Sequence, residues 1–474
     1  MLESHQIGQA DEDISRLVLR KIDTRLIPLL FVTYMLSFMD KTILSSASVF
    51  GLKEDTGLQG QEYSWVSSVF YVGYLLWTYP TTILVARLPI GKYLGANTLF
   101  WGAVVALTAA CSGFRGLLAA RFLLGVAEAT ITPAFVFVTS TWYTREEMPS
   151  RTGIWFSGNS FGGLLASLFA FGIGHVHDSV GPWRWMFILL GTATFLWAIV
   201  LLRLLPDSIS TAEFLTEEER QVANERIVAA GTGRTERTAW RREQVMECLV
   251  DPKTWFIFGL EVLTQIPNGG TQNFANLVIK SFGFTSLQST LVNIPYSILS
   301  ATMIAGTGHL AGRFHQANCL LIVAAVIPCV IGSALIYSRA QLPSSVQLLG
   351  YFLLSSGPSA MPLALSLVQT NYRGVTKKMT MTALLFLGYC AGNIAGPQLF
   401  REAEAPLYPT AFRSIVVCYG LVIVLVIGLR YYLKWQNACR DWDEAIVGQG
   451  PDHSDTHADH DLTDWQTSGF RYRY

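Results

Sequence analysis

The chain is poor in charge. Asp, Glu, Lys and Arg supply only 14% of its 474 residues, whereas 51% of the residues are hydrophobic. A soluble domain carries about 25% charged residues, so this composition excludes an ordinary soluble protein and indicates a membrane protein. Lys plus Arg and Asp plus Glu balance at 34 each, which gives the chain no general attraction to nucleic acid.

Several motifs of enzymes and pumps are missing. The sequence has no Walker lysine loop, no H-E-x-x-H pair and no N-x-S/T acceptor. Its seven cysteines include no C-x-x-C pair, and most lie in apolar runs, where cysteine acts as a small hydrophobe. We therefore expect no enzyme, no metal or other cofactor, and no ATP-driven pump. About 25 polar residues precede the first apolar run, so we also expect no cleavable signal peptide.

The sequence has instead twelve long apolar runs. A helix of about 20 residues crosses the hydrocarbon core of a bilayer, and lipid offers no partner to backbone groups, so each run is expected to be helical. The predicted fold is an all-α membrane protein with two groups of six spans. The expected spans are 26–47, 64–85, 94–114, 117–140, 154–176 and 184–204, then 254–277, 287–311, 317–338, 345–368, 379–400 and 411–433.

Three polar segments complete the predicted domain plan, which places six-helix bundles at 26–204 and 254–433. Residues 1–25 are expected to be a cytosolic segment. Within it, residues 11–25 carry apolar and basic positions at helical spacing, which fits either a helix on the membrane surface or a plain leader into the first span. In the central loop 205–253, Thr216 and Glu219 predict a capping box and a short helix.

The tail 434–474 is predicted to be disordered towards its end. His453, His457 and His460 there leave metal binding as a weaker alternative. Because basic residues concentrate before the first span and in the central loop, both termini are predicted to lie in the cytosol.

The two halves repeat each other. Arg87 ends the second span, and Arg313 ends the eighth, 226 residues later. Gly158 and Gly162 in the fifth span match Gly388 and Gly392 in the eleventh at an offset of 230. Near-constant offsets indicate a duplicated six-helix unit. Such glycines let helices approach closely. The glycine-rich spans could pivot at the seam between the halves, or the glycines could serve static packing alone.

Four ionisable residues lie inside spans that should exclude them: Asp40, Lys41, Arg121 and Glu128. A charge at the bilayer centre costs roughly 2.5–3.5 kcal/mol, so these residues are expected to face a bundle interior or a water-filled path. We expect two acid–base pairs, Asp40 with Lys41 and Arg121 with Glu128, the latter about two helical turns apart on one face. A substrate anion that displaces a carboxylate from its cation would couple anion and proton. A purely structural salt bridge is the alternative.

Polar side chains in the second half extend this hypothesis. Gln265 precedes the segment Ile266-Pro267-Asn268-Gly269-Gly270, and Asn268 lies within it. The segment predicts a break in the seventh span beside a cavity. Glu261 lies nearby, either as a third member of the charged set or as a wetted gate residue. Asn159 and Asn393 add amides to the glycine-rich spans. Tyr74 is a further candidate, although aromatic residues in that span also suit lipid or core contacts.

These segments give the chain a resemblance to the major facilitator superfamily, and within it to the anion:cation symporter family and its fungal allantoate permease branch. The segments that carry the resemblance are Phe38-Met39-Asp40-Lys41-Thr42, Tyr79-Pro80-Thr81-Thr82 with Arg87-Leu88-Pro89, Arg121-Phe122-Leu123-Leu124-Gly125-Val126-Ala127-Glu128, Leu205-Pro206-Asp207-Ser208, Ile266-Pro267-Asn268-Gly269-Gly270, Asn371-Tyr372-Arg373-Gly374, and Gly388-Tyr389-Cys390-Ala391-Gly392-Asn393.

The resemblance implies a carrier with two pseudo-symmetric bundles that works by alternating access and takes up organic anions with protons. It implies that Asp40 and Glu128 are proton sites, and that Lys41 and Arg121 pair with them or with a substrate carboxylate. Many relatives carry Arg where Lys41 stands, and Lys cannot hold a carboxylate in a bidentate manner.

The resemblance further implies substrate contacts at Tyr74, Asn159 and Asn393, and gating roles for Arg87 and Arg313. Ala86 and Gly312 stand where the superfamily usually has an acid before that arginine.

The sequence therefore predicts a secondary transporter, with protons as the coupling ion and a ureide, vitamin or carboxylate as substrate. Its expected partners are this small molecule and the lipid bilayer, with no nucleic acid, and we expect a monomer in the plasma membrane. Two alternatives stay open. One is an exporter or uncoupled facilitator on the same fold, and the other is a nutrient sensor that transports nothing.

Overall fold

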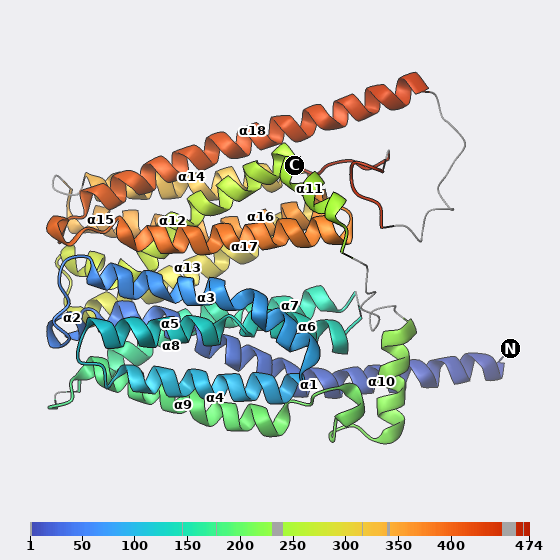
Figure 1. Ribbon diagram of the computed structural model, residues 1–474, viewed down its shortest axis with the longest axis horizontal. Helices are drawn as coiled ribbons and strands as arrows, with labels where there is room; N and C mark the ends of the chain where they lie inside the picture. The colour runs from blue at the N-terminus through green and yellow to red at the C-terminus, as the bar shows by residue number, and fades with distance from the viewer. Residues whose placement is uncertain are drawn as a thin grey trace. The chain divides into compact units, whose positions relative to one another are not determined.

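A computed structural model describes residues 2–474 except 145, 177, 230–239, 315, 339–341, 448–460 and 468. The described chain is helical throughout its apolar runs (Figure 1), as predicted. Helices of the first six expected spans are α1 (Leu2–Ala47), α3 (Glu62–Arg87), α4 (Ile90–Thr108), α5 (Phe114–Glu128) with α6 (Ile131–Trp142), α7 (Met148–Phe156) with α8 (Gly158–Ile173), and α9 (Pro182–Leu204).

The last six expected spans are helical as well. Their helices are α12 (Pro252–Ser281), α13 (Ser286–Arg313), α14 (Asn318–Tyr337), α15 (Ser344–Leu353) with α16 (Ala360–Asn371), α17 (Val375–Gln398) and α18 (Pro409–Val447). Short helices α2 (Leu52–Asp55), α10 (Glu217–Ala229) and α11 (Arg242–Val250) lie outside the expected spans.

Nine helical stretches of the described chain are long and apolar enough to cross a membrane. Paired helices such as α5 and α6 count together, as the single stretch Phe114–Trp142. The other three expected spans, α4, α12 and α13, do not meet that measure. In α12 the polar residues Glu261, Gln265 and Asn268 lower the apolar character, which fits a helix with a polar face inside the protein.

The chain clusters into two compact units. The N-terminal unit comprises residues 1–237 and 285–294, and the C-terminal unit comprises 238–284 and 295–474. The division falls within the central loop, so α10 belongs to the first unit and α11 to the second.

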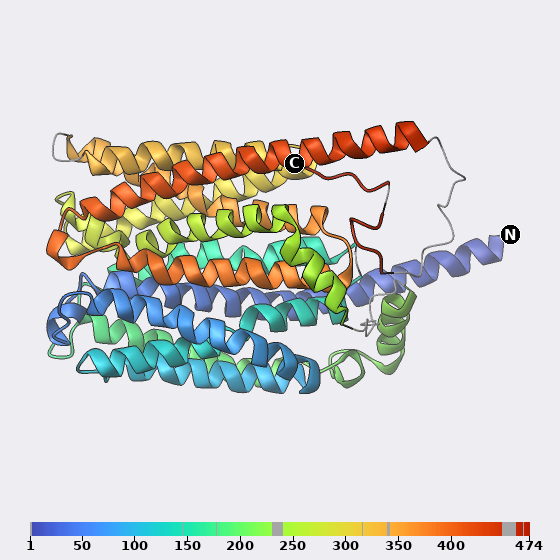
Figure 2. The same ribbon diagram turned by 45° about the horizontal axis from the view of Figure 1, so that its top comes forward.

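Corresponding helices pack in the same way within each unit, which supports the predicted duplication. In the N-terminal unit α1 packs on α8, and α4 packs on α9. In the C-terminal unit the equivalent helices α12 and α17 pack together, as do α14 and α18. Figure 2 shows these helices side by side within each unit.

The repeated glycines lie at these seams. A Cβ added to Gly162 of α8 would lie 2.6 Å from the carbonyl oxygen of Met35 in α1. A Cβ added to Gly396 of α17 would lie 2.3 Å from the carbonyl oxygen of Ile266 in α12. These glycines therefore pack helices inside each unit, which fits the alternative of static packing, while a role as a pivot stays a prediction.

Helix α12 is continuous, which corrects the predicted break at 266–270. Pro267 lies inside the helix, and the side chains of Thr271 and Asn273 bond the carbonyl oxygens of Pro267 and Gly269 at 2.7 and 2.8 Å. Gly269 and Gly270 instead make room for α17 and Phe400. These glycines serve helix packing, so no unwound backbone is needed.

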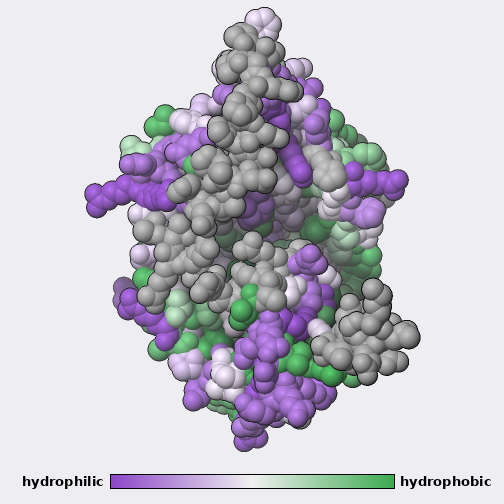
Figure 3. Space-filling view, turned by 90° about the vertical axis from the view of Figure 1, so that its right-hand side faces the viewer, coloured by the Kyte–Doolittle hydropathy of each residue, from purple (hydrophilic) through white to green (hydrophobic). Residues whose placement is uncertain are grey.

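The predicted capping box is confirmed at the start of α10. The amide of Glu219 donates to the hydroxyl of Thr216 at 3.3 Å, and the amide of Thr216 donates to the Glu219 carboxylate at 3.0 Å. Glu219 also pairs with Lys21 of α1 at 2.5 Å. Helix α1 runs without interruption from this region into the first span, so residues 11–25 are a leader of the span helix. Hydrophilic side chains gather at the end of the molecule that carries α10 (Figure 3).

Candidate functional site

An ion pair between α1 and α5 lies at the centre of the N-terminal unit. The ammonium of Lys41 lies 3.1 Å from Oε2 of Glu128. The hydroxyl of Ser37, one turn before Lys41 on α1, donates to the same oxygen at 2.8 Å. The Glu128 side chain is fully buried, whereas that of Lys41 is 22% exposed. Lys41 is therefore the member of the pair that solvent or a solute can reach.

Asp40 is fully buried and has a different partner from the one predicted. Residues adjacent on a helix do not face each other, so Asp40 and Lys41 form no ion pair. Instead the indole Nε1–H of Trp101 in α4 donates to Oδ2 of Asp40. Oδ1 of Asp40 has no hydrogen-bond partner among the described residues.

Arg121 is also buried, with its guanidinium 5.7 Å from the ring centre of Phe187 in α9. The predicted pair with Glu128 is not formed, since seven residues along a helix separate Cα atoms by about 10.5 Å and Lys41 occupies the carboxylate. Among the described residues, Nε and Nη2 of Arg121 have no hydrogen-bond partner.

Together these residues form a charge cluster, by which we mean Asp40, Lys41, Arg121 and Glu128. Two acids and two bases balance its formal charge, and all four interact electrostatically across α1 and α5. Oε1 of Glu128, like Oδ1 of Asp40, has no hydrogen-bond partner within the described chain. The cluster thus holds unused donors and acceptors in a buried place, where unpaired polar groups are costly. Such a site can take up a proton or an anion.

Two of the predicted substrate contacts lie beside this cluster. The ring centre of Tyr74 in α3 is 5.8 Å from the Lys41 ammonium. Asn159 in α8 is half-buried and lies next to the hydroxyl of Tyr34, which itself interacts with Lys41.

The remaining predicted amides meet in the C-terminal unit. Oε1 of Gln265 accepts from Asn268 at 3.0 Å and from Asn393 of α17 at 3.2 Å. Asn268 also donates to Asn393 at 3.4 Å. Glu261, one turn earlier on α12, is fully buried, and neither of its carboxyl oxygens has a hydrogen-bond partner among the described residues. We call Gln265, Asn268 and Asn393 the amide cluster.

The two predicted gating residues lie at helix ends. Arg87 is the last residue of α3, Arg313 is the last residue of α13, and both are exposed. Their equivalent places agree with the repeat, while their gating role stays a prediction.

Sequence reasoning missed three residues of the charge-cluster environment: Ser37, Trp101 and Phe187. Ser37 lies three residues before Asp40 and four before Lys41, a spacing that places it on the same helical face. Trp101 and Phe187 come from other helices, and no sequence spacing connects them with the charges.

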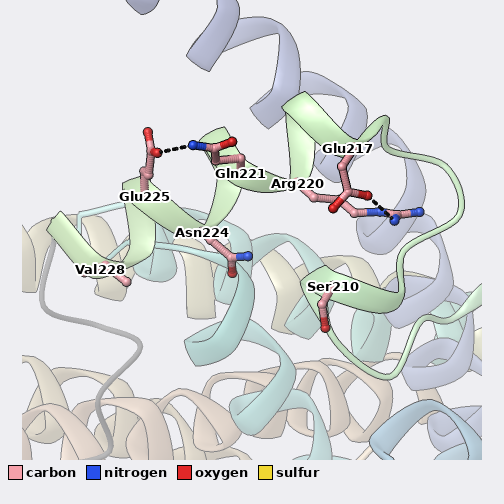
Figure 4. A pocket seen from close by; sticks show the side chains of 7 residues that line it. All are labelled: Ser210, Glu217, Arg220, Gln221, Asn224, Glu225 and Val228. Carbon is pink, nitrogen blue, oxygen red and sulfur yellow. Dashed lines mark hydrogen bonds and ion pairs between the residues drawn. The ribbon is translucent and has the colours of Figure 1, made fainter.

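Two other features have the form of sites without supporting transport or catalysis. A surface hollow of about 540 Å³ lies along α10 and is lined by Ser210, Glu217, Arg220, Gln221, Asn224, Glu225 and Val228 (Figure 4). Its polar groups pair with each other: Arg220 forms an ion pair with Glu217, and the amide of Gln221 donates to Glu225. The spacing G-x-S-x-G does occur, at 158–162, but inside helix α8 rather than on the strand-to-helix turn of a hydrolase.

A sequence model of the Major Facilitator Superfamily matches residues 30–397, which is most of the chain. The chain belongs to this superfamily. It is therefore a multi-pass membrane protein and a secondary transporter of a small molecule rather than an enzyme.

Several fungal transporters are similar to the chain over most of its length. An uncharacterized transporter of Schizosaccharomyces pombe is 34% identical over 98% of this chain and 90% of its own length. The allantoate permease of Saccharomyces cerevisiae is 32% identical over 95% of this chain and 85% of its own. A thiamine pathway transporter of the same yeast is 30% identical over 98% of this chain and 87% of its own length. The predicted likeness to the allantoate permease branch is confirmed.

Solved structures confirm the predicted fold. A bacterial homologue of the human lysosomal transporter Spinster, in an inward-facing unoccupied conformation, matches with a TM-score of 0.65 over 88% of this chain and 96% of its own, at 15% identity. A D-xylose–proton symporter matches with the same TM-score over 85% and 97%, at 13% identity. The chain thus has the facilitator fold of two six-helix bundles.

Proposed function

We propose that this transporter carries a small organic anion together with protons by alternating access. The observation that carries the proposal is the charge cluster: two acids and two bases buried in one unit, with donors and acceptors left unused. We further propose that it works as a monomer in the plasma membrane, with both termini in the cytosol.

Competition for Lys41 supplies the coupling. Lys41 is the partly exposed member of its ion pair, so an arriving carboxylate can attract its ammonium. Glu128 would then be left as a buried carboxylate without a cation, which is strongly unfavourable. Taking up a proton removes that penalty, because a neutral carboxyl can stay buried and keep its hydrogen bond with Ser37. Anion binding and proton uptake at Glu128 thus favour each other.

Asp40 and Arg121 form the second half of the proton site in this proposal. The indole N–H of Trp101 fixes the orientation of the Asp40 carboxyl and leaves its other oxygen free to carry a proton. The guanidinium of Arg121 compensates the negative charge when that proton leaves. Its Nε and Nη2, which have no hydrogen-bond partner among the described residues, can also donate to a water or a substrate oxygen.

The amide cluster and the relatives favour a substrate that carries amide-like groups as well as a carboxylate. Carboxamide side chains both donate and accept hydrogen bonds, so they suit ureido groups. One of the relatives is an allantoate permease, and allantoate has one carboxylate and two ureido groups. We therefore propose a ureide or a similar carboxylate as the first substrate class to test, with Tyr74 and Asn159 as further contacts.

Reconstitution into liposomes tests this proposal. Labelled allantoate, followed by a panel of vitamins and carboxylates, is offered under an inward-directed proton gradient. We expect accumulation above equilibrium that a protonophore abolishes. Uptake that ignores the gradient would favour a facilitator or exchanger. No flux of any tested anion would move the assignment towards a sensor.

A further inference from the structure

A second group of buried charges lies far along the chain from the transport residues, at the end of the C-terminal unit that carries α11. Lys253 and Lys377, the former in the first turn of α12 and the latter in the first turn of α17, are both fully buried. Each pairs with Asp251 and with Asp464, at distances from 2.5 to 3.2 Å. Lys377 also pairs with Glu247 of α11 at 2.7 Å.

Asp464 reaches this place because the last residues of the chain fold back onto the unit. This corrects the prediction that the end of the tail is disordered, for residues 461–474 apart from 468; the three tail histidines lie outside the described residues. Figure 1 draws this segment in dark red, ending at the C-terminus. We call residues 461–474 the strap.

Two aspartates anchor the start of the strap. The Asp461 carboxylate accepts from the amide of Val375 at 2.7 Å and from Nε2 of Gln244 at 3.0 Å. Asp464, three residues later, bridges Lys253 and Lys377. Asp251 already pairs with both lysines and Glu247 pairs with Lys377. Asp464 adds a further carboxylate, which both buried lysines hold at 2.5 and 2.8 Å.

The other end of the strap is held through its backbone. Asn437 of α18 both donates to the carbonyl of Tyr472 and accepts from its amide, at 2.9 and 2.8 Å. Asn371 of α16 holds the backbone of Arg473 in the same reciprocal way, with both bonds at 2.8 Å. The Tyr472 hydroxyl donates to Asp464 at 2.8 Å, which closes the strap on itself.

Arg440 of α18 fixes the loop between these two ends. Its guanidinium donates to the carbonyl oxygens of Asp464 and Phe470, both at 2.9 Å, and to the Tyr472 hydroxyl at 2.9 Å. Gly374, at φ +88°, makes the turn before α17, and a Cβ there would meet Gln244 at 2.9 Å and Thr463 at 3.1 Å. The strap and the helices that it contacts are therefore packed closely, without room for a side chain at position 374.

We propose that α11 with the adjoining ends of α12, α16, α17 and α18 forms a peptide-binding groove. It recognises two aspartates three residues apart followed by aromatic residues, and the strap of the same chain is its occupant. The covalent neighbour α18 itself supplies Asn437 and Arg440, which favours the chain's own segment over one from another protein. Bound there, the strap clamps the ends of α12, α17 and α18 together.

Cutting the chain between α18 and the strap after folding tests whether the groove binds the strap without a covalent connection. A protease site is inserted within residues 448–460 of the full chain, and the purified protein is cleaved and passed over a size-exclusion column. We expect the strap fragment to remain with the protein. In Asp464→Asn, which keeps the side-chain shape but removes the charge between two buried lysines, we expect retention to be weaker by about tenfold or more, because the bonds to two charged lysines are weakened.

Asp441→Asn is the matched control. Asp441 pairs with Arg471 of the strap at 2.7 Å but is exposed, so its loss should change retention by less than about fivefold. Monodispersity before cleavage shows whether each variant folds. Should Asp464→Asn fail to fold, labelled peptides of residues 461–474, with and without that substitution, are added to cleaved, washed wild-type protein.

Three outcomes would overturn the proposal. The first is loss of the wild-type fragment as soon as the link is cut. The second is equal retention of the wild-type and Asp464→Asn fragments or peptides. The third is retention only in a dimer peak, which would assign the occupant to a second copy of the chain.

Discussion

At the residue scale, the charge cluster has three buried members and one member, Lys41, that solvent can reach. Asp40, Glu128 and Arg121 are buried between helices, while Lys41 reaches a partly exposed place. Lys presents a compact charge on a flexible stem, so its ammonium can turn between Glu128 and a solute anion. The four predicted residues lie together, and their pairing differs from the prediction, while their part in transport stays a prediction.

Replacing either acid should uncouple the transporter. Asp40→Asn and Glu128→Gln cannot release a proton, so we expect proton-driven accumulation to be lost while counterflow exchange of substrate continues. Glu54→Gln is the control, since Glu54 is an exposed acid of α2. Normal accumulation in both acid variants would show that protons bind elsewhere.

The Lys41–Glu128 pair should behave as one unit in a double-mutant cycle. Lys41→Met leaves Glu128 as a buried, unpaired acid, and breaking such a pair costs about 3–5 kcal/mol. We expect a lower thermal midpoint for Lys41→Met, and partial recovery when Glu128→Gln is added. Additive losses in the double variant would mean that the two residues do not depend on each other.

Strap binding should depend on pH through Asp464. Burial alone would raise the pKa of Asp464, but Lys253 and Lys377 outweigh it and hold this pKa below its ordinary value of 3.8. A group with a depressed pKa stabilises the bound state above its ordinary pKa and loses this effect as the pH falls through the lowered one. Retention of the cleaved strap should therefore be constant from about pH 8 to 5 and decline only below about pH 4. Loss of the strap near neutral pH would contradict this.

At the element scale, the seams between α1 and α8 and between α12 and α17 are made by glycine. Backbone meets backbone there, so a side chain of any size has no space. The same packing explains why α12 continues through Pro267: the neighbouring helix fits against Gly269 and Gly270 only if α12 keeps its helical form.

A methyl group at this seam should be enough to disturb it. In Gly396→Ala the added Cβ would lie 2.3 Å from the carbonyl oxygen of Ile266, so one helix has to shift. Overpacking of this kind costs about 1–3 kcal/mol, and we expect a lower thermal midpoint of the purified protein.

Gly420→Ala in α18 is the control for that variant, because a Cβ at Gly420 meets nothing within 4 Å. Replacing glycine by alanine inside a helix gains up to about 1 kcal/mol, so this variant should be as stable as the wild type or more so. Equal behaviour of the two variants would mean that the seam is looser than described.

At the scale of the whole molecule, the two units share a helix plan and differ in chemistry. The N-terminal unit holds the charge cluster, and the C-terminal unit holds the neutral amide cluster and the strap. Duplication thus gave one scaffold two sets of polar residues: one suited to protons and carboxylates, the other to amide-like groups and to a peptide.

The proposed orientation of the chain in the membrane can be tested with single-cysteine variants. Cys111 lies in the connection between α4 and α5, and Cys439 lies on α18 beyond the last expected span. With both termini in the cytosol, a membrane-impermeant maleimide should label Cys111 and not Cys439 in intact cells. Permeabilised cells supply the control, where both should react. The reverse pattern in intact cells would invert the topology.

The sequence by itself determined the helices, their number and the repeat, because apolar length, basic flanks and offsets between landmarks are properties of the chain order. It also determined which residues are out of place in a bilayer, since Asp40, Lys41, Arg121 and Glu128 stand inside long apolar runs that are visible in the sequence alone. The capping box at Thr216 is equally local.

The tertiary structure alone decided which of these residues meet. Lys41 pairs with Glu128 because α1 and α5 face each other, and Trp101 reaches Asp40 from α4, a contact that no spacing encodes. The seam of α12 and α17 kept Pro267 inside a continuous helix. The strap is held in place because Lys253 and Lys377, which are 124 positions apart, come together and both bind its Asp464. From the sequence alone, a polar and charged tail predicts disorder, because the buried lysines that bind it are known only from the tertiary structure.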